Sequence, residues 1–327
     1  MKYPFTPPTP KKVQNTKSTS APKKVKNTNT QKNSKTTKYT TNYRGKGKIN
    51  KRDSTFTVLL SNLRGYKSKE YSLRKIIKKV KPSMVLLNET QLVGNMKVSI
   101  NPYSSWTKNR SEKGGGGIAT VVSQNYKDLA VGAGEGENND EYLVTRIDAF
   151  SPALNVINNY GEQRSTKKED IEEKWQRFRK ELENVRLRGE FCLWAGDLNK
   201  LVGTGELGFP GNTQEVSLGG RLLRELLATK DWVLVNGLGR EVVEGGPFTR
   251  RDPATGNMSC LDMFIVSREL LPHVDKVFID KDRKITPPRA IKNQGKFKLV
   301  YSDHFALLLT LKDLPRKKDK KHEKKKA

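Results

Sequence analysis

The chain has 327 residues, of which 30% are charged, and its formal net charge at pH 7 is +28. No stretch reaches the ~20 apolar residues that a membrane-spanning helix needs, and residues 1–4 (MKYP) do not lead into an apolar signal core. The two cysteines, Cys192 and Cys260, lie inside apolar runs and indicate buried, reduced thiols rather than a disulfide framework or a zinc site. These features argue against the membrane and disulfide-rich secreted classes and predict an intracellular protein.

Most of the positive charge lies towards the two ends of the chain. Residues 1–52 contain thirteen Lys, two Arg and no acid, and residues 312–327 contain nine basic and three acidic residues. The first segment is Lys/Thr/Asn/Pro-rich and has too few large aliphatic residues to offset its ordering entropy. We therefore predict disordered basic tails over residues 1–52 and 313–327, and one folded domain over residues 53–312. The charge favours a nucleic-acid partner, although acidic membrane surfaces or nuclear import could also use such tails.

Within the domain, short apolar runs of strand character alternate with helices that carry one apolar face. Helices are expected over residues 70–80, 167–188 and 218–227. Strands are expected over residues 56–61, 84–87, 118–122, 142–147, 154–160, 191–195, 232–235, 261–266 and 305–311. Many short strands with a few helices between them predict a layered α/β domain, and we find no internal repeat.

Polar side chains gather where these strands begin or end, and loops at strand ends commonly carry function. They are Asn62, Glu89, Asp197, Asn199, Asp262, Asp303 and His304. Oxygen ligands of this kind suit Mg²⁺, which keeps several waters and needs only one or two carboxylates. A His beside a carboxylate supplies a titratable base, which phosphodiester cleavage requires. Taken singly, each motif also fits a turn or a helix cap, so the interpretation depends on the whole set.

The ordered set resembles the endonuclease/exonuclease/phosphatase family. The family pattern has an Asn, then Glu-Thr after an apolar strand, then Asn-x-Tyr, Gly-Asp-x-Asn, Ser-x-Leu/Ile-Asp and Ser-Asp-His. This chain has, in the same order, Asn62, Glu89-Thr90, Asn158-Asn159-Tyr160, Gly196-Asp197-Leu198-Asn199, Ser259-Cys260-Leu261-Asp262 and Ser302-Asp303-His304. The resemblance covers about residues 55–312. It implies a four-layer α/β sandwich with two packed, mostly antiparallel sheets and a site at one end.

The resemblance also implies a role for each matching residue. Glu89 would be the main ligand of Mg²⁺, or of Mn²⁺ as a substitute, with Asn62 and Asp303 close to the metal. Asp197 would orient or deprotonate the attacking water, and Asn199 would hold the scissile phosphate. His304, polarised by Asp262, would contact the phosphate or act as a base.

Tyr160 narrows the resemblance to two branches of the family. Sphingomyelinase-like, inositol-phosphatase-like and pancreatic deoxyribonuclease-like members usually carry His at this point. Abasic-site endonucleases and the endonucleases of non-LTR retrotransposons carry Tyr, whose hydroxyl can donate to a phosphate oxygen. Arg64 stands where abasic-site enzymes often have Asp, which removes one ligand and weakens the repair interpretation. Gly161-Glu162-Gln163 also departs from the Ala/Val-Pro that commonly follows the Tyr.

Two further segments resemble the retrotransposon branch. They are the glycine-rich residues 111–117 and Phe248-Thr249-Arg250-Arg251. Arg64, Arg110, Arg250 and Arg251 lie near the motifs and are candidate contacts to the phosphates of the substrate, which position DNA without reading its bases.

The sequence thus predicts a monomeric nuclear endonuclease that nicks DNA, as in retrotransposon target-site cleavage. A reverse-transcriptase domain or element RNA would be a further partner if the chain is part of a longer product, and no membrane partner is expected. An abasic-site repair endonuclease, a phosphoesterase for a small or lipid substrate, and a catalytically silent nucleic-acid-binding module remain alternatives.

Overall fold

The computed structural model of the chain describes residues 55–110, 115–135, 141–162, 166–203, 216–293 and 296–317. The predicted tail over residues 1–52, residues 318–327 and residues 111–114 of the glycine-rich segment lie outside the described residues. The described chain continues past residue 312, where we predicted the domain to end. Leu314 is buried, and the guanidinium of Arg316 lies 5.9 Å from the ring centroids of Tyr126 and Phe150. This packing explains why the folded part extends to Lys317.

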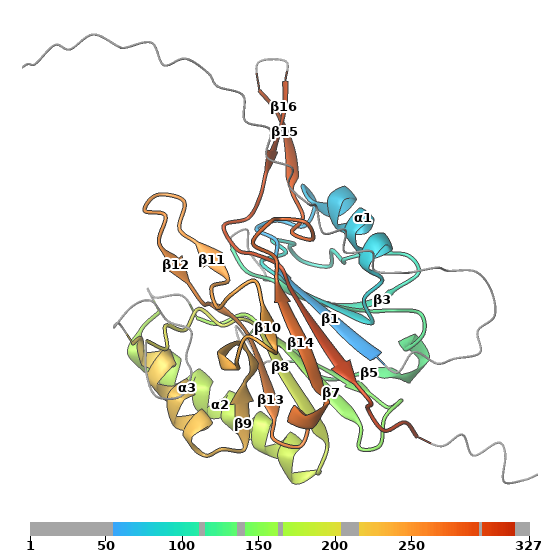
Figure 1. Cartoon of the computed structure of the whole chain (residues 1–327), viewed down its shortest axis with the longest axis vertical. Helices are drawn as coiled ribbons and strands as arrows, with labels where there is room; N and C mark the ends of the chain where they lie inside the picture. The colour runs from blue at the N-terminus through green and yellow to red at the C-terminus, as the bar shows by residue number, and fades with distance from the viewer. Residues whose placement is uncertain are drawn as a thin grey trace, which may run out of the picture. The chain divides into compact units, whose positions relative to one another are not determined.

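Two large sheets form the centre of the described domain (Figure 1). The first has seven strands in the order β10-β14-β17-β1-β2-β4-β3. Their bounds are β10 Val243–Glu244, β14 Val274–Ile279, β17 Leu307–Lys312, β1 Thr55–Asn62, β2 Met84–Asn88, β4 Ile118–Val122 and β3 Ser104–Lys108. The second has six strands in the order β5-β6-β7-β8-β13-β9. Their bounds are β5 Ala130–Glu135, β6 Tyr142–Ile147, β7 Leu154–Asn159, β8 Phe191–Asp197, β13 Asp262–Ser267 and β9 Trp232–Leu234.

Most strand pairs in both sheets are antiparallel. The exceptions are β1 with β2, β10 with β14, and β7 with β8, which run parallel. Two short antiparallel hairpins form separate two-stranded sheets. They are β11 (Arg250–Arg251) with β12 (Met258–Ser259), and β15 (Arg289–Asn293) with β16 (Lys296–Val300).

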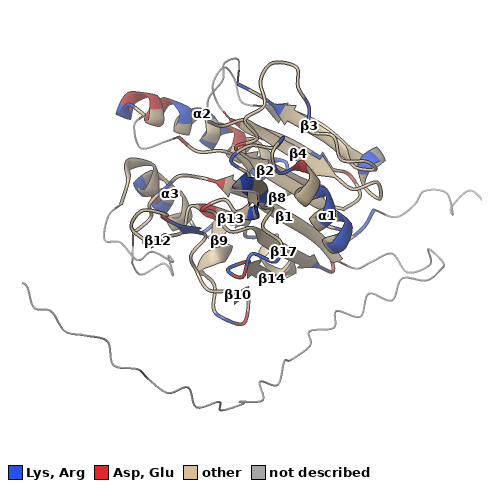
Figure 2. Ribbon diagram, turned by 90° about the horizontal axis from the view of Figure 1, so that it is seen from above, with Lys and Arg blue, Asp and Glu red and all other residues tan. Residues whose placement is uncertain are grey.

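Apolar side chains separate the domain into four layers. Along β1, Val58 and Leu60 join the cluster that packs between the sheets, whereas Leu59 joins the cluster on the outer face. Successive strand residues point to opposite faces, so a strand that is apolar on both faces lies between two layers. Helix α1 (Glu70–Val80) covers the first sheet, while α2 (Lys168–Leu187) and α3 (Leu218–Ala228) cover the second. The view from above places α1 opposite α2 and α3 (Figure 2). The predicted four-layer sandwich is confirmed.

All three predicted helices and all nine predicted strands occur, with ends that differ by at most two residues. The sequence did not predict β3, β5, β10, β14 or the two hairpins, whose strands are very short, or are partly exposed and lack a clear apolar alternation. Cys192 and Cys260 are both buried and free, as predicted. Among the described residues, no helix combines the length and apolar character needed to cross a membrane.

Glu190 ties β6 and β7 to the start of β8, and its ionisation should make stability depend on pH. Burial alone would raise the pKa of this carboxyl, but hydrogen bonds from Arg146, Asn155 and Arg188 lower it to about 2. A lowered pKa stabilises the fold above the unfolded-state value of about 4.3, and this stabilisation is lost as pH falls towards 2. Glu190→Gln is expected to lower the free energy of unfolding by about 1–3 kcal/mol at pH 7.

Urea denaturation at pH 7, 4 and 3 measures the effect, and the difference from the wild type should shrink as pH falls. Glu173→Gln is the matched control, because Glu173 forms an exposed i,i+4 pair with Arg177 on α2. Such pairs contribute less than about 0.5 kcal/mol. A Glu190→Gln difference that stayed constant with pH would contradict the predicted linkage.

Candidate active site

The polar motif residues converge because of strand direction. β1 and β2 are parallel and end at Asn62 and Asn88, and β7 and β8 are parallel and end at Asn159 and Asp197. β13 is antiparallel to β8, and its first residue, Asp262, pairs with Asp197. β17 is antiparallel to β1 and begins just after His304. The ends of four strands and the starts of two therefore meet at one edge of the two sheets.

Left-handed backbone turns the chain sharply at three of these ends. Arg64, Glu89 and Asn199 have φ angles of 47°, 49° and 51°, a conformation that few residues other than Gly adopt and that recurs at functional sites. Gly196 is required by space as well, because a Cβ there would lie 1.7 Å from the carbonyl oxygen of Asn159. The Gly of the Gly-Asp-x-Asn motif thus permits the close approach of β7 and β8 directly before Asp197.

Buried amides join the two sheets beneath the site. The Oδ1 of Asn88 accepts a 2.8 Å hydrogen bond from the backbone N–H of Asp197, and its Nδ2 donates to the Oδ1 of Asn158 at 3.0 Å. Asn158 in turn donates to the carbonyl of Ala119 on β4. Because a buried amide is costly unless its hydrogen bonds are made, these contacts fix the two sheets relative to each other where Asp197 emerges.

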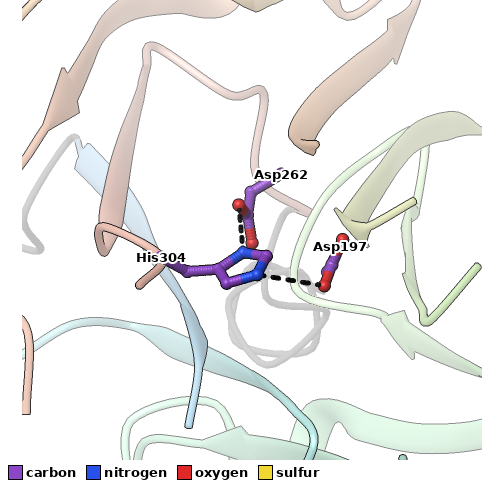
Figure 3. Close-up of side chains that lie close together, drawn as sticks. All are labelled: Asp197, Asp262 and His304. Atoms are coloured by element: carbon purple, nitrogen blue, oxygen red, sulfur yellow. Dashed lines mark hydrogen bonds and ion pairs between the residues drawn. The ribbon is translucent and has the colours of Figure 1, made fainter. Parts of the chain in front are cut away.

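His304 lies between two buried carboxylates (Figure 3). Its Nδ1 is 2.8 Å from the Oδ2 of Asp262, and its Nε2 is 3.8 Å from the Oδ2 of Asp197. The hydroxyl of Thr249 accepts hydrogen bonds from the backbone N–H groups of Leu261 and Asp262 at 3.0 and 2.9 Å. Thr249 therefore holds the loop that presents Asp262 to the imidazole.

This arrangement raises the pKa of the His304 imidazole and that of the neighbouring Asp197 carboxyl. Burial alone would lower the pKa of His304, but the carboxylates of Asp262 and Asp197 raise it to about 9. Burial raises the pKa of Asp197 to about 6, against the lowering effect of His304. The two carboxylates thus favour the cationic form of the imidazole, and burial makes Asp197 a stronger base than an exposed carboxylate.

Glu89 is bound by two donors. Its Oε1 accepts hydrogen bonds from the Nδ2 of Asn62 at 3.0 Å and from the hydroxyl of Tyr160 at 3.2 Å. Asn62 also donates to the Oδ2 of Asp197 at 2.8 Å. Its amide N–H₂ group faces both carboxylates, so in this structure Asn62 orients Glu89 and Asp197 and does not present an oxygen to a metal ion.

Glu89 offers the site a ligand for a divalent cation. The hydrogen bonds between described residues reach only the Oε1 of Glu89, which leaves its Oε2 available as a ligand. One or two carboxylates are enough for Mg²⁺, which keeps several waters. Asp197, Asp262 and His304 form a second donor set, with ligand atoms within 4.8 Å of one another. Its imidazole suits Mg²⁺ less well than an oxygen does, and it is already hydrogen-bonded to Asp262. Glu89 is therefore the better candidate for Mg²⁺.

Asp303 lies between two of the predicted phosphate-binding arginines. Its Oδ1 accepts from Arg64 and its Oδ2 from Arg250, each at 2.8 Å. Burial would raise the pKa of Asp303, but the charge of His304, together with the charge of Arg64 and the hydrogen bonds from Arg250 and Arg64, lowers it. The side chain of Asp303 thus binds the two arginines, and its place close to the metal ion stays a prediction. The guanidiniums of Arg64 and Arg250 both lie at the edge of the site, and each already forms an ion pair with Asp303.

The other three predicted contacts are held differently. Arg110 donates to Glu141 at 2.6 Å and lies 6.0 Å from the ring centroid of Tyr160. Asn199 donates through its side-chain amide to the carbonyl of Gly161 at 3.1 Å. Arg251 is exposed on the β11–β12 hairpin, and its backbone N–H donates to the carbonyl of Asp303.

Two residues that support the site were missed in the sequence. The carboxylate of Glu141 accepts from Arg110 and from the backbone N–H of Gly117, and its carbonyl accepts from the backbone of Tyr160. Arg283 donates to the carbonyls of Ser302 and His304 at 2.7 and 2.5 Å. No local motif marks either residue, since each acts through contacts to segments far away in the sequence.

Comparison with known proteins agrees with this geometry. Residues 59–304 match the model of the Endonuclease/Exonuclease/phosphatase family. No curated protein matches the chain significantly in sequence. The solved structures that match share the fold at low identity. One is the AP endonuclease LMAP from Leishmania major, at 18% identity and a TM-score of 0.58, covering 79% of this chain and 88% of that one.

Two further solved structures illustrate the range of matches. The endonuclease domain of TRAS1, a telomere-specific non-LTR retrotransposon, is 16% identical, with a TM-score of 0.55 and coverage of 79% of this chain and 98% of that one. The 3′ phosphatase NExo from Neisseria, bound to a product DNA hairpin, is 15% identical, with a TM-score of 0.57 and coverage of 78% and 98%. At this identity the likeness establishes the fold.

Proposed function

We propose that this chain, which belongs to the endonuclease/exonuclease/phosphatase family, is a Mg²⁺-dependent endonuclease that nicks DNA as in retrotransposon target-site cleavage. Members of this family are typically nucleases or phosphatases, and its nucleases usually use a divalent metal ion. The observation that carries the proposal is the convergence of two groups at one sheet edge. His304 with Asp262 and Asp197 forms one group, and Glu89 with Asn62 and Tyr160 forms the other.

The two groups supply complementary parts of phosphodiester hydrolysis. Mg²⁺ held by Glu89 would stabilise charge on the phosphate oxygens and the leaving group. Asp197, whose pKa is about 6, accepts the proton of the attacking water. The cationic imidazole of His304 donates to a non-bridging phosphate oxygen, and Asp262 keeps its ring oriented. Tyr160 stands beside Glu89, where its hydroxyl can donate to a second phosphate oxygen.

DNA is the substrate that the surroundings favour. Arg64, Arg110, Arg250 and Arg251 lie around the site, and further positive charge lies in residues 1–52. Arginines at such positions contact phosphates and set the register of the duplex. Similar solved structures include a DNA-bound phosphatase, AP endonucleases and a retrotransposon endonuclease domain. The pairing of Arg64 with Asp303 supports the nickase over an abasic-site enzyme, because a cation stands where the repair enzymes often have an acid.

The test is the conversion of supercoiled plasmid to relaxed circles by the full chain. We expect cleavage with Mg²⁺, weaker or equal cleavage with Mn²⁺, and none with EDTA. A parallel reaction compares a duplex that carries one abasic site with the same duplex undamaged. Cleavage of intact DNA at a rate within about tenfold of the abasic duplex would support the nickase.

Other outcomes would redirect the proposal. Cutting confined to the abasic duplex would identify a repair endonuclease. Release of phosphate from a 3′-phosphorylated duplex, added as a third substrate, without cutting of the other two would identify a phosphatase. A folded protein that binds DNA and cuts neither substrate would be a silent binding module, and the endonuclease proposal would then be wrong.

A further inference from the structure

The β15–β16 hairpin stands out from the sheets at the end of the domain that also carries the β11–β12 hairpin (Figure 1). Its strands pair from Arg289 with Val300 to Asn293 with Lys296. Among the described strands, neither β15 nor β16 pairs with any other. The hairpin is therefore a two-stranded ribbon whose two faces are open to a partner.

The root of the ribbon is attached to the turn that carries His304. Val300 ends β16 two residues before Ser302. Arg283, which precedes β15, donates to the carbonyls of Ser302 and His304, and its guanidinium lies 4.3 Å from the ring centroid of Phe305. The hydroxyl of Thr286 accepts from the backbone of Ala306 at 3.0 Å. The start of β15 and the end of β16 thus both lie close in sequence to residues that are fixed to the catalytic turn, so a partner on the ribbon would be placed beside the site.

The exposed side chains of the ribbon are basic and apolar. Residues 286–301 contain four basic residues and no acid; these are Arg289, Lys292, Lys296 and Lys298. Phe297 is 78% exposed and Leu299 55%. Lys292 lies directly opposite Phe297 in the register, and Ala290 opposite Leu299. Residues that pair in this way share one face, so this face presents three apolar side chains, with Lys292 opposite the aromatic ring.

An exposed aromatic among lysines suits nucleic acid better than a protein surface. Phosphates would satisfy the cations, and a ring can pack on bases or sugars. An isolated two-stranded ribbon buries too little apolar surface to be stable by itself. The hydrogen bonds of Arg283 and Thr286 at its root supply part of the missing stability. The major groove of B-DNA is wide enough to admit a two-stranded β-ribbon.

We propose that the β15–β16 hairpin is a DNA-binding arm that enters the groove of the duplex next to the scissile phosphate. Lys292, Lys296 and Lys298 contact phosphates, and Phe297 packs against the base edges or sugars. The inference rests on the proposed DNA substrate. It states that the hairpin, which lies outside the catalytic residues, binds the part of the duplex that flanks the cleaved bond.

Binding to a 30-base-pair duplex tests the arm separately from cleavage. All proteins are full chains that carry His304→Asn, so that the duplex stays intact during the measurement. The arm variant adds Lys292→Gln, Lys296→Gln and Lys298→Gln. We expect its affinity to fall on the order of tenfold at 0.1 M salt, and the slope of log K against log salt to decrease by about 2–3, because each lost phosphate contact removes about 0.9. Phe297→Ala should weaken binding without changing the slope.

The matched control removes three exposed lysines elsewhere, by Lys127→Gln, Lys180→Gln and Lys230→Gln. This control should keep the affinity and the salt slope of the protein that carries His304→Asn alone. If the arm and control variants had equal slopes of log K against log salt, the hairpin would not be a DNA-binding arm, even if the wild type nicks plasmid. A slope change on single-stranded DNA with none on duplex would overturn the groove contact. A wild type that cuts nothing, yet binds duplex with an arm-dependent slope, would overturn only the proposed cleavage.

Discussion

Replacing His304 by Asn is expected to reduce plasmid nicking by about 10²–10³-fold, the range that one donor to the developing charge of the transition state contributes. The Asn amide reaches the position of the ring Nδ1, so the 2.8 Å contact with Asp262 can be kept while the Nε2 that faces Asp197 is lost. His304→Ala would instead leave Asp262 buried without its partner, a change that destabilises proteins strongly. Nicking rates and thermal melting of both variants separate these two effects.

His273→Ala is the matched control for this experiment. His273 is the other histidine among the described residues; it contacts the carbonyl of Lys312 at the opposite end of β17. It should nick at the wild-type rate. If His304→Asn melted like the wild type and still cut at a rate within threefold of it, the imidazole would have no part in the reaction.

The local elements could be predicted because their signals are local. The face of α1 that carries Leu73, Ile76 and Ile77 repeats at helical spacing, and Pro82 follows the helix. The helix from Glu70 to Val80 was predicted residue for residue. Several predicted strands, such as β2 and β8, are apolar on both faces, which is typical of a strand buried between two layers. β14 and β16 were missed because they alternate poorly or are exposed.

The site could be predicted only as a set of residues. Each motif marks a strand end, but its sequence does not say which ends meet. The parallel pairing of β1 with β2 and of β7 with β8 brings the ends together. The amides of Asn88 and Asn158 then join the sheets. Asn88 stands beside Glu89 in the sequence, yet its structural role depends on contacts to residues about 70 and 109 positions away.

The arginines show a second limit of sequence reading. Proximity to the motifs made Arg64, Arg110 and Arg250 candidate phosphate contacts, but a sequence does not reveal the carboxylate that each one meets. Arg64 and Arg250 share Asp303, and Arg110 binds Glu141. These pairs keep three cations ordered at the rim before a substrate arrives. Ordering in advance reduces the entropy that binding must overcome.

Glu89→Gln should lower nicking by about 10²–10³-fold, because a lost metal ligand removes several kcal/mol of charge stabilisation. Gln keeps an oxygen that can accept from Asn62 and Tyr160, so the local hydrogen bonds survive. The change replaces only the charged Oε2 by an amide N–H₂ group. A second readout does not depend on activity: Mg²⁺ should raise the melting temperature of the wild type, since a ligand that binds only the folded state stabilises it. Glu89→Gln should lose most of this increase.

Glu244→Gln is the charge-matched control, because Glu244 forms an exposed pair with Lys276 on the β10–β14 edge. It should keep both the nicking rate and the response to Mg²⁺. Asp197→Asn distinguishes the two candidate metal positions. If the Mg²⁺ response survived Glu89→Gln but vanished in Asp197→Asn, the ion would belong to the group of Asp197, Asp262 and His304. The imidazole would then be a ligand and not the cationic phosphate contact, so the loss in His304→Asn would have to be explained by loss of metal.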